Sequence, residues 1–414
     1  VITLRTCRCA LVALLLAAPA LHAPESRADV PADVPVVENP ATPADGRTVL
    51  QPQKLWRIGG YDETYLFGVV ASSAVDADGV AYLLDEQLSE ITAVDTEGNT
   101  VTTFGRAGEG PGEMDRGQVV MTLPDGRIGV LNMRPPKLIT YTKQGDPAGD
   151  ISLTGNEGLN FSTTARSAGD RVVVQTKNTS FGAKTQTSTD ALRALDVETG
   201  EYVMDYLVQT DERDRLGDGN SMVVTIGDGF VEHWALFEDG SMAIVREADD
   251  YAIEILDAEG RHLRRLRRVG ERARRRQDSV DRDRAERRSL AERTGMDIDA
   301  DDVETHYPAI SSIHARPNGE LWVLPGEGLA PRDAAVLGVF DVFDTEGRFV
   351  RQVEVRLPYE REEDHFSMHG DAIVVYENLI GARGGGYLVT GDVVAEAEPD
   401  EMHADPLAIS RYRF

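Results

Sequence analysis

Cysteine is nearly absent from this sequence. The 414 residues include two cysteines, Cys7 and Cys9, and both lie in an N-terminal segment that we expect to be removed. The mature chain would then have no disulfide and no thiol chemistry. Its stability has to come from the burial of apolar side chains.

Long apolar runs are equally scarce. The longest covers residues 9–18, follows two arginines and precedes small residues near Ala20 and Ala23. This pattern is typical of a secretory signal, and the run is shorter than the roughly 20 residues that a transmembrane helix needs. We therefore expect residues 1–23 to be a signal peptide. The mature protein would be secreted or lie in the periplasm or cell envelope.

Positively charged residues are fewer than negatively charged ones. Lysine and arginine together number 43 against 71 acidic residues, a formal net charge of −28. Such a field repels nucleic acids and anionic membranes, so neither is an expected partner. Solubility is the simplest consequence, with calcium or a cationic partner as the functional alternative.

Familiar catalytic motifs are missing as well. No serine stands in a nucleophile-elbow setting, and no cofactor fingerprint is present. We therefore expect no organic cofactor. The sequence leans away from an enzyme, although this absence is weak support for a binding protein.

Proline and small residues dominate residues 24–52, which contain six prolines among alanine, aspartate and valine. This composition cannot bury a core and predicts a disordered linker. The folded domain is expected over residues 53–414. That length is large for one ordinary core but suits a repeat architecture.

Two kinds of glycine turn alternate along the predicted domain. Six short turns lie between strand-like runs, at Gly79, Gly126, Gly169, Gly240, Gly319 and Gly370. Five more close runs of alternating apolar residues, at Gly98, Gly145, Gly200, Gly260 and Gly347. Glycine tolerates the positive φ that tight hairpins require. The pattern predicts six four-stranded meanders, an all-β, six-bladed β-propeller.

The missing sixth turn of the second kind predicts how the ring closes. If KLWRI, before Gly59, is the outer strand of the last blade and the final run LAISRYRF is its third strand, no turn has to join them. We expect closure by strands from both termini. The run YLVTGDVV at residues 387–394 competes for the place of the final run.

The glycine-rich stretch FGRAGEGPGEM, residues 104–114, raises the question of a phosphate loop. Glu109 and Glu113 flank its glycines, no Lys-Ser/Thr pair follows, and the next predicted element is a strand. These features argue against phosphate binding. The stretch is expected to carry the chain from the outer strand of one blade to the inner strand of the next.

Together with the preceding DADGVAYLLDEQLSEITAVDTEGNTV, this stretch resembles the repeat of NHL-type secreted bacterial six-bladed β-propeller proteins. That family's blade boundary runs F-G-x-x-G-x-G-P-G-E-F, and Met114 stands here in place of the final aromatic residue. The resemblance implies the fold. It leaves the function open, because most members have no established catalytic residues.

Propeller ligands generally gather on the face where the outer-to-inner returns meet the loops between second and third strands. We predict a ligand-binding face there, with charged loop residues more often solvated than functional. Its members are Asp85, Arg106, Glu109, Asn132, Arg134, Lys177, Asn178, Arg246, Glu247, Glu327, Glu377 and Asn378.

Three histidines offer a metal hypothesis. His233, His314 and His365 lie an odd number of residues before their hairpin glycines and so share one strand phase. Imidazoles from neighbouring blades could bind zinc, as in amidating lyases that share the fold. Loop carboxylates, among them Asp85 and Glu377, could instead hold calcium in the manner of lactonase-type propellers. Single strand histidines are more often simply hydrogen-bonded.

An arginine-rich insertion is expected at residues 270–306, between the fourth and fifth blades. Residues 261–293 hold fourteen arginines and many helix formers but few apolar residues. We predict a mostly exposed helix over the ligand face. It is a surface helix paired with the acidic body, or alternatively a lid or docking arm.

These observations favour a secreted, monomeric binding propeller that holds a protein, peptide or glycan ligand around its central channel. The alternative is a metal-dependent lyase or lactonase-type hydrolase with its zinc or calcium in the channel. A purely structural envelope role is not distinguished from binding by the sequence.

Overall fold

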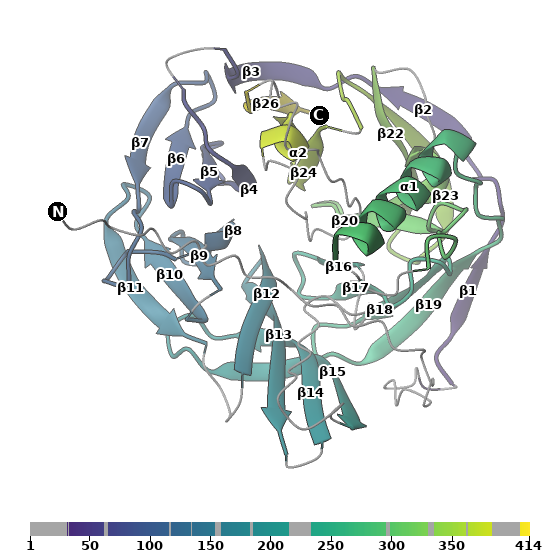
Figure 1. The fold of residues 1–414 in the computed structure, drawn as a ribbon, viewed down its shortest axis with the longest axis horizontal. Coiled ribbons are helices and arrows are strands. Elements are labelled where there is room, and N and C mark those ends of the chain that lie inside the picture. The colour runs from purple at the N-terminus through teal and green to yellow at the C-terminus, as the bar shows by residue number, and fades with distance from the viewer. Residues whose placement is uncertain are drawn as a thin grey trace.

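The computed structural model describes residue 31 and residues 33–61, 65–115, 117–133, 135–153, 159–182, 185–214, 233–294, 299–329, 335–361, 363–382 and 406–414. Over these residues, six sheets surround a common centre (Figure 1). Each contains a four-stranded antiparallel meander. The chain is a six-bladed β-propeller, as the turns predicted.

The first three blades follow one another along the chain, inner strand first. Blade 1 contains β4 (Val70–Val75), β5 (Ala81–Asp85), β6 (Glu90–Val94) and β7 (Thr100–Phe104). Blade 2 contains β8 (Gly117–Thr122), β9 (Ile128–Asn132), β10 (Lys137–Tyr141) and β11 (Pro147–Ser152). Blade 3 contains the longer strands β12 (Leu159–Ala168), β13 (Arg171–Phe181), β14 (Thr185–Leu195) and β15 (Tyr202–Asp214).

The remaining blades complete the ring. Blade 4 contains β16 (His233–Leu236), β17 (Met242–Val245), β18 (Ala252–Leu256) and β19 (His262–Arg268). Blade 5 contains β20 (Ile310–Ala315), β21 (Leu321–Pro325), β22 (Val336–Phe343) and β23 (Phe349–Arg356), with a 3₁₀ turn η1 (Gly326–Leu329). Blade 6 contains β24 (His365–His369), β25 (Ala372–Glu377), β26 (Ala408–Arg413) and β3 (Gln53–Gly59), with the short helix α2 (Leu379–Ala382).

The hairpin turns form for the reason that the sequence suggested. Gly79 has a φ of +80°, and a Cβ atom there would lie 2.9 Å from the Thr96 side chain. The Asp76 carboxylate accepts hydrogen bonds from the amides of Asp78 and Val80, at 3.0 and 2.9 Å. An aspartate that holds its own turn, followed by glycine in the left-handed region, fixes the hairpin locally.

Most middle strands are largely buried, because both of their faces pack against neighbouring blades. Every residue of β5, β9, β10 and β21 is buried. Outer strands such as β11 instead alternate between exposed and half-buried residues. The apolar core therefore lies between blades, so each blade depends on both neighbours.

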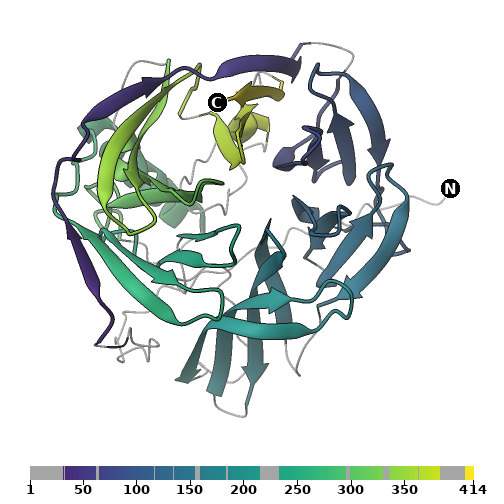
Figure 2. The ribbon, with the colours of Figure 1, turned by 180° about the vertical axis from the view of Figure 1, so that it is seen from behind.

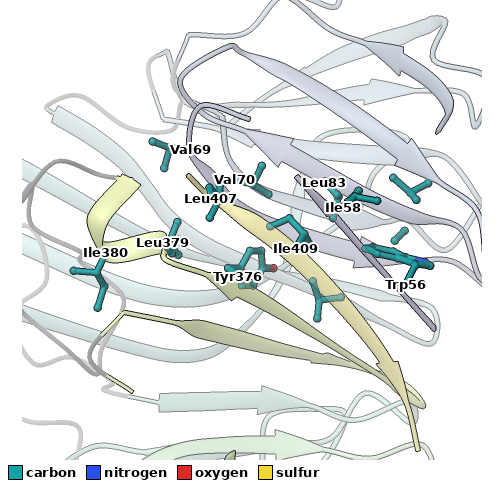
Figure 3. Packing of buried hydrophobic residues seen from close by; sticks show 13 residues of the cluster. Trp56, Ile58, Val69, Val70, Leu83, Tyr376, Leu379, Ile380, Leu407 and Ile409 are labelled. Carbon is teal, nitrogen blue, oxygen red and sulfur yellow. The ribbon is translucent and has the colours of Figure 1, made fainter. Parts of the chain in front are cut away.

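Strands from the two ends of the chain close the ring, as predicted. The order of the blade 6 sheet is β24-β25-β26-β3, with Ile409 opposite Ile58. Figure 3 shows the apolar cluster at this junction, in which Trp56 and Ile58 of β3 lie with Ile409 of β26 and with Val70 and Leu83 of blade 1. The competing run at residues 387–394 lies outside the described residues.

The prediction of a disordered linker over residues 24–52 differs from the structure at two places. β1 (Val36–Asn39) pairs in parallel with β19, and β2 (Arg47–Leu50) pairs in parallel with β23. β1, β2 and β3 thus follow the outer edges of blades 4, 5 and 6 in succession, as the purple ribbon of Figure 2 shows. Open edge strands offer unpaired backbone groups, and the proline-free stretches VVEN and RTVL pair with them.

Asn39 anchors this outer segment. Its side-chain amide donates to the Gly347 carbonyl at 3.0 Å, and its side-chain oxygen accepts from the Phe349 amide at 2.8 Å. The side chain is buried between blades 4 and 5. Two buried hydrogen bonds give the segment a fixed register on the propeller.

The predicted insertion contains the helix α1 (Gln277–Thr294), on one side of the ring over blade 5 (Figure 1). Val280 is its buried residue among those described, at 3% exposure. Several of its arginines pair with acids of the insertion itself, such as Arg284 with Asp281 at 3.1 Å. The insertion is a largely exposed helix, as expected. Over the described residues, no helix has both the length and the apolar character to span a membrane.

Candidate functional site

The glycine-rich loop at residues 104–114 is closed by its own glutamate. The Glu113 carboxylate accepts a hydrogen bond from the Gly110 amide at 2.9 Å and from Arg106 Nε at 2.7 Å. These contacts hold the pKa of Glu113 below its usual range. A carboxylate of the chain thus occupies the place that an anion would need, which agrees with the interpretation of this stretch as a turn.

Several residues of the predicted ligand-binding face hold loops in place. Asp85 is buried and accepts hydrogen bonds from the amides of Gly68, Val69, Gln87 and Leu88, at 2.6 to 3.1 Å. Asn132 acts similarly in blade 2, accepting from the Asp115 amide and donating to the Pro135 carbonyl. Both side chains bridge the return from one blade to the turn of the next. Their role is structural.

Other members of this face pair with residues of their own blade or a neighbouring one. The observed pairs are Arg246 with Glu254 at 2.8 Å, Lys177 with Asp190 at 3.4 Å, Glu327 with Arg268 at 3.0 Å, Glu377 with Arg57 at 2.8 Å, and Asn178 with Asn160 at 2.8 Å. The Asn378 backbone amide donates to the Asp364 carboxylate at 2.9 Å. Arg106 and Glu109 are exposed, whereas Arg134 lies outside the described residues. Glu247 accepts a backbone hydrogen bond from the Asp250 amide.

The three predicted histidines belong to inner strands of consecutive blades: His233 to β16, His314 to β20 and His365 to β24. Burial lowers the pKa of His314 to about 3, and the charges of Arg166, Arg316, His233 and His365 add to this effect. His314 therefore lies within electrostatic reach of both other rings. Its Nε2 is 3.0 Å from the Ser312 hydroxyl.

Closeness of these rings does not amount to a metal site. Among the described residues, which include all three histidines, no group of three or more His, Cys, Asp or Glu side chains could hold a metal ion. Zinc bound by His233, His314 and His365 gains no support from the geometry, and neither does calcium bound by the loop carboxylates. The metal hypothesis is left to direct analysis of the purified protein.

Arg166 was missed by sequence reasoning, although it belongs to the inner strand β12. Its guanidinium lies 5.1 Å from the centre of the Trp234 ring of blade 4. Its charge helps to lower the pKa of His233, His314 and His369, in each case after burial. These residues come from blades 4, 5 and 6, so Arg166 lies where the inner strands converge. An arginine inside the inner-strand run FSTTARSAG was the available signal.

A polar cluster between blades 1 and 6 was missed as well. His369 Nε2 lies 2.9 Å from the hydroxyls of both Ser73 and Ser367, and the Tyr376 hydroxyl donates to Ser73 at 2.7 Å. Ser73 and Tyr376 are buried, and His369 is half-buried. The four side chains satisfy one another across the junction that the chain termini close. Burial, with Arg166 and Arg411 nearby, lowers the pKa of His369 to about 4.

The lowered pKa values of these histidines predict that the fold is less stable in acid. Burial first, and then the charge of Arg166, lowers the pKa of His233 to about 4, near that of His369 and above that of His314. Unfolded histidines titrate near 6.5, so between about pH 6.5 and 4 the unfolded chain binds more protons. As the pH is lowered through this range, the free energy of unfolding should therefore decrease by up to about 1.4 kcal/mol per pH unit for each histidine.

One carboxyl group opposes this trend. Burial raises the pKa of Asp364 to about 6, so this group stabilises the fold as the pH falls from about 6 to 4. Three histidines outweigh it. Urea unfolding between pH 7 and 4 measures the slope, which His314→Gln should make shallower. His306→Gln, in the insertion, is the control, and an unchanged slope in His314→Gln would contradict the assignment.

Comparisons with known proteins give only low similarities. No protein-family model matches the sequence, and no curated protein is similar to it. Similar solved structures include virginiamycin B lyase from Staphylococcus aureus, with 10% identity over 87% of this chain and 99% of that chain and a TM-score of 0.39. Regucalcin, a calcium-binding protein from Agrobacterium tumefaciens, gives 12% identity over 88% and 96% and a TM-score of 0.42.

A member of the DUF4221 family from Bacteroides vulgatus gives 10% identity over 87% of this chain and 97% of that chain, with a TM-score of 0.46. Identities and scores this low support no inference about activity. The class of this protein, a six-bladed β-propeller, is defined by its own sheet order.

Proposed function

We propose that this protein is a secreted binding propeller that holds its ligand at the central channel, where the inner strands meet. The observation that carries the proposal is the convergence of Arg166 with His233, His314 and His369, from four consecutive blades. Strands fixed by packing between blades hold such a constellation more rigidly than loops would.

Electrostatics favour this place over the loop face. Most of the described charged residues of the predicted loop face pair with neighbours, as Arg246 does with Glu254. The channel histidines are instead neutral at pH 7, because burial lowers the pKa of His233, His314 and His369 to about 4, 3 and 4. Neutral imidazoles offer both a hydrogen-bond donor and an acceptor. The channel therefore has the polar groups that orient a bound molecule.

A ligand screen tests the proposal. The purified mature protein would be screened by thermal shift against small molecules, peptides and glycans, and any hit measured by titration calorimetry. We expect His233→Ala to weaken binding of a hit about tenfold, the loss of one good hydrogen bond. Val203→Ala, exposed on the outer strand β15, is the matched control. Binding that no channel substitution weakens would contradict the proposed site.

Metal analysis of the same preparation tests the alternative. We expect neither zinc nor calcium at stoichiometric amounts, since no cluster of three or more His, Cys, Asp or Glu side chains that could hold a metal is found among the residues that the structure describes. Stoichiometric metal that is lost on His233→Ala or Glu377→Ala would favour the lyase or hydrolase hypothesis.

A further inference from the structure

The environment of Arg166 is unusual for an arginine in this propeller. Its side chain is exposed to solvent, although it belongs to an inner strand, and it stacks over Trp234. Although part of its surface is open to solvent, the protein atoms around the guanidinium lower its pKa by partial desolvation, and no carboxylate acts on it among the described residues. Within the same part of the chain, no ion pair or hydrogen bond engages its guanidinium.

Other arginines of the described structure show the contrast. Arg246 binds Glu254 with two hydrogen bonds, at 2.8 and 3.1 Å, and Arg351 binds Glu320 in the same way at 2.7 and 2.8 Å. Arg316 stacks on Trp322 as Arg166 does on Trp234, yet Glu320 and Asp371 act on its charge. A chain with 71 acidic residues could readily supply a partner. Arg166 lacks one in the described structure.

Trp234 gives the guanidinium a fixed orientation. The Trp234 indole donates to Gln175 Oε1 at 3.0 Å, so the ring is held by a hydrogen bond between blades 3 and 4. Stacking on a tryptophan face leaves the edge of the guanidinium, with its N–H groups, available for an acceptor. The arginine is therefore oriented before any ligand arrives, which reduces the entropy cost of binding.

The neighbouring imidazoles complete the environment. His233, His314 and His369 lie within electrostatic reach of Arg166, and a positive charge nearby favours their neutral form. Arg316 also acts on His314 and Arg411 on His369, so the described side chains with a fixed charge that act on these neutral rings are all arginines. A negative group placed there would gain the attraction of Arg166 without repulsion from any described carboxylate.

We propose that Arg166 binds an oxyanion of the ligand, a carboxylate or a phosphate group, by charge-assisted hydrogen bonds from its fork of N–H donors. This inference rests on the proposed function, because it places the anion in the same channel and names the chemical class of its occupant.

Two small anions serve as probes. Wild-type protein would be titrated with sodium succinate and with inorganic phosphate at constant ionic strength, following tryptophan fluorescence and the thermal midpoint. We expect saturable binding of at least one probe. Arg166→Gln should weaken it roughly 10- to 100-fold, the range for charge-assisted hydrogen bonds. The preference between the probes distinguishes a carboxylate from a phosphate ligand.

Arg193→Gln is the matched control. Arg193 belongs to β14 of the same blade and stacks on Tyr202 at 5.5 Å, but it is paired with Asp205 at 3.0 Å. Its substitution should leave binding unchanged. Arg166→Lys keeps the charge and loses the fork, so it should recover part of the affinity for phosphate and less for succinate.

The outcomes separate this proposal from the function on which it rests. Absence of saturable binding of either probe, or equal binding by Arg166→Gln and wild type, would overturn the anion assignment. A neutral or cationic hit that binds in the channel would also overturn it, while the binding function would stand. Failure of every ligand screened, of any charge, would overturn both.

Discussion

Deletion of Ala408–Phe414 is expected to abolish cooperative folding of the propeller. The deleted segment contains β26, the strand between β25 and β3. Ala408, Ile409, Ser410, Arg411 and Tyr412 are all buried. Truncation of one large buried side chain costs about 2–5 kcal/mol. Loss of the whole strand therefore exceeds the roughly 5–15 kcal/mol that stabilises a typical domain. Thermal and urea unfolding followed by circular dichroism would measure the effect.

Truncation at the other end gives the control. Removal of residues 1–52 eliminates β1 and β2 but leaves β3 in blade 6. This variant loses the two buried hydrogen bonds of Asn39, worth about 1–3 kcal/mol. It should still unfold cooperatively, because the ring is closed. If the variant without residues 408–414 kept a cooperative transition near the wild-type midpoint, closure by both termini would not be what stabilises the fold.

Asp341→Ala is expected to lower the free energy of unfolding by about 3–5 kcal/mol, because it leaves a buried cation without its main counter-ion. Asp341 is fully buried and pairs with Arg268. It also accepts hydrogen bonds from the Tyr251 hydroxyl at 2.7 Å and from Gln352 at 2.9 Å. Burial raises the pKa of Asp341, whereas the Asp341 charge raises that of Arg268 against the effect of its own burial. Urea denaturation measures the loss.

Two further variants distinguish the effect of breaking the buried ion pair from the effect of removing a side chain. Glu259→Ala removes a carboxylate from an exposed pair with Arg261 and should cost less than about 1 kcal/mol. The double variant Arg268→Met/Asp341→Leu should recover much of the loss, because no buried charge is left unpaired. A loss below about 1 kcal/mol in Asp341→Ala would show that the Arg268–Asp341 pair between blades 4 and 5 contributes little to the free energy of unfolding.

The turns were predictable because their cause is local. Gly79 and Gly319 adopt φ values of +80° and +81°, a conformation that glycine tolerates regardless of what surrounds it. Regular spacing of such turns was enough to predict six blades. The absence of one turn was enough to predict which terminal strands pair.

The outer segment was missed because its structure depends on partners far away in the sequence. β1 pairs with β19, more than two hundred residues later. Composition around β1 and β2 carries no sign of this pairing, because the edges of blades 4 and 5 supply it. A proline-rich segment can be ordered wherever an open edge accepts it.

Counting residues from the hairpin glycine was also a poor measure of position in the channel. In blade 6, His369 pairs directly with Ala372 across a two-residue turn. In blade 5, Ala315 pairs with Leu321 across a longer one. Histidines at the same distance from their glycines thus lie at different heights above the turns. Only the structure shows that the His233 and His365 rings lie close enough to His314 to affect its pKa.

The sequence by itself determined the number of blades, the terminal strands that close the ring and the helical insertion. Backbone turns and strand periodicity are short-range properties. Only the tertiary structure decided which charged residues are paired and which are not. Pairing depends on contacts between blades that lie far apart in the chain. That is why Asp85 and Arg246 are bound to neighbouring groups, while Arg166, one arginine among many in the sequence, has no carboxylate partner among the described residues.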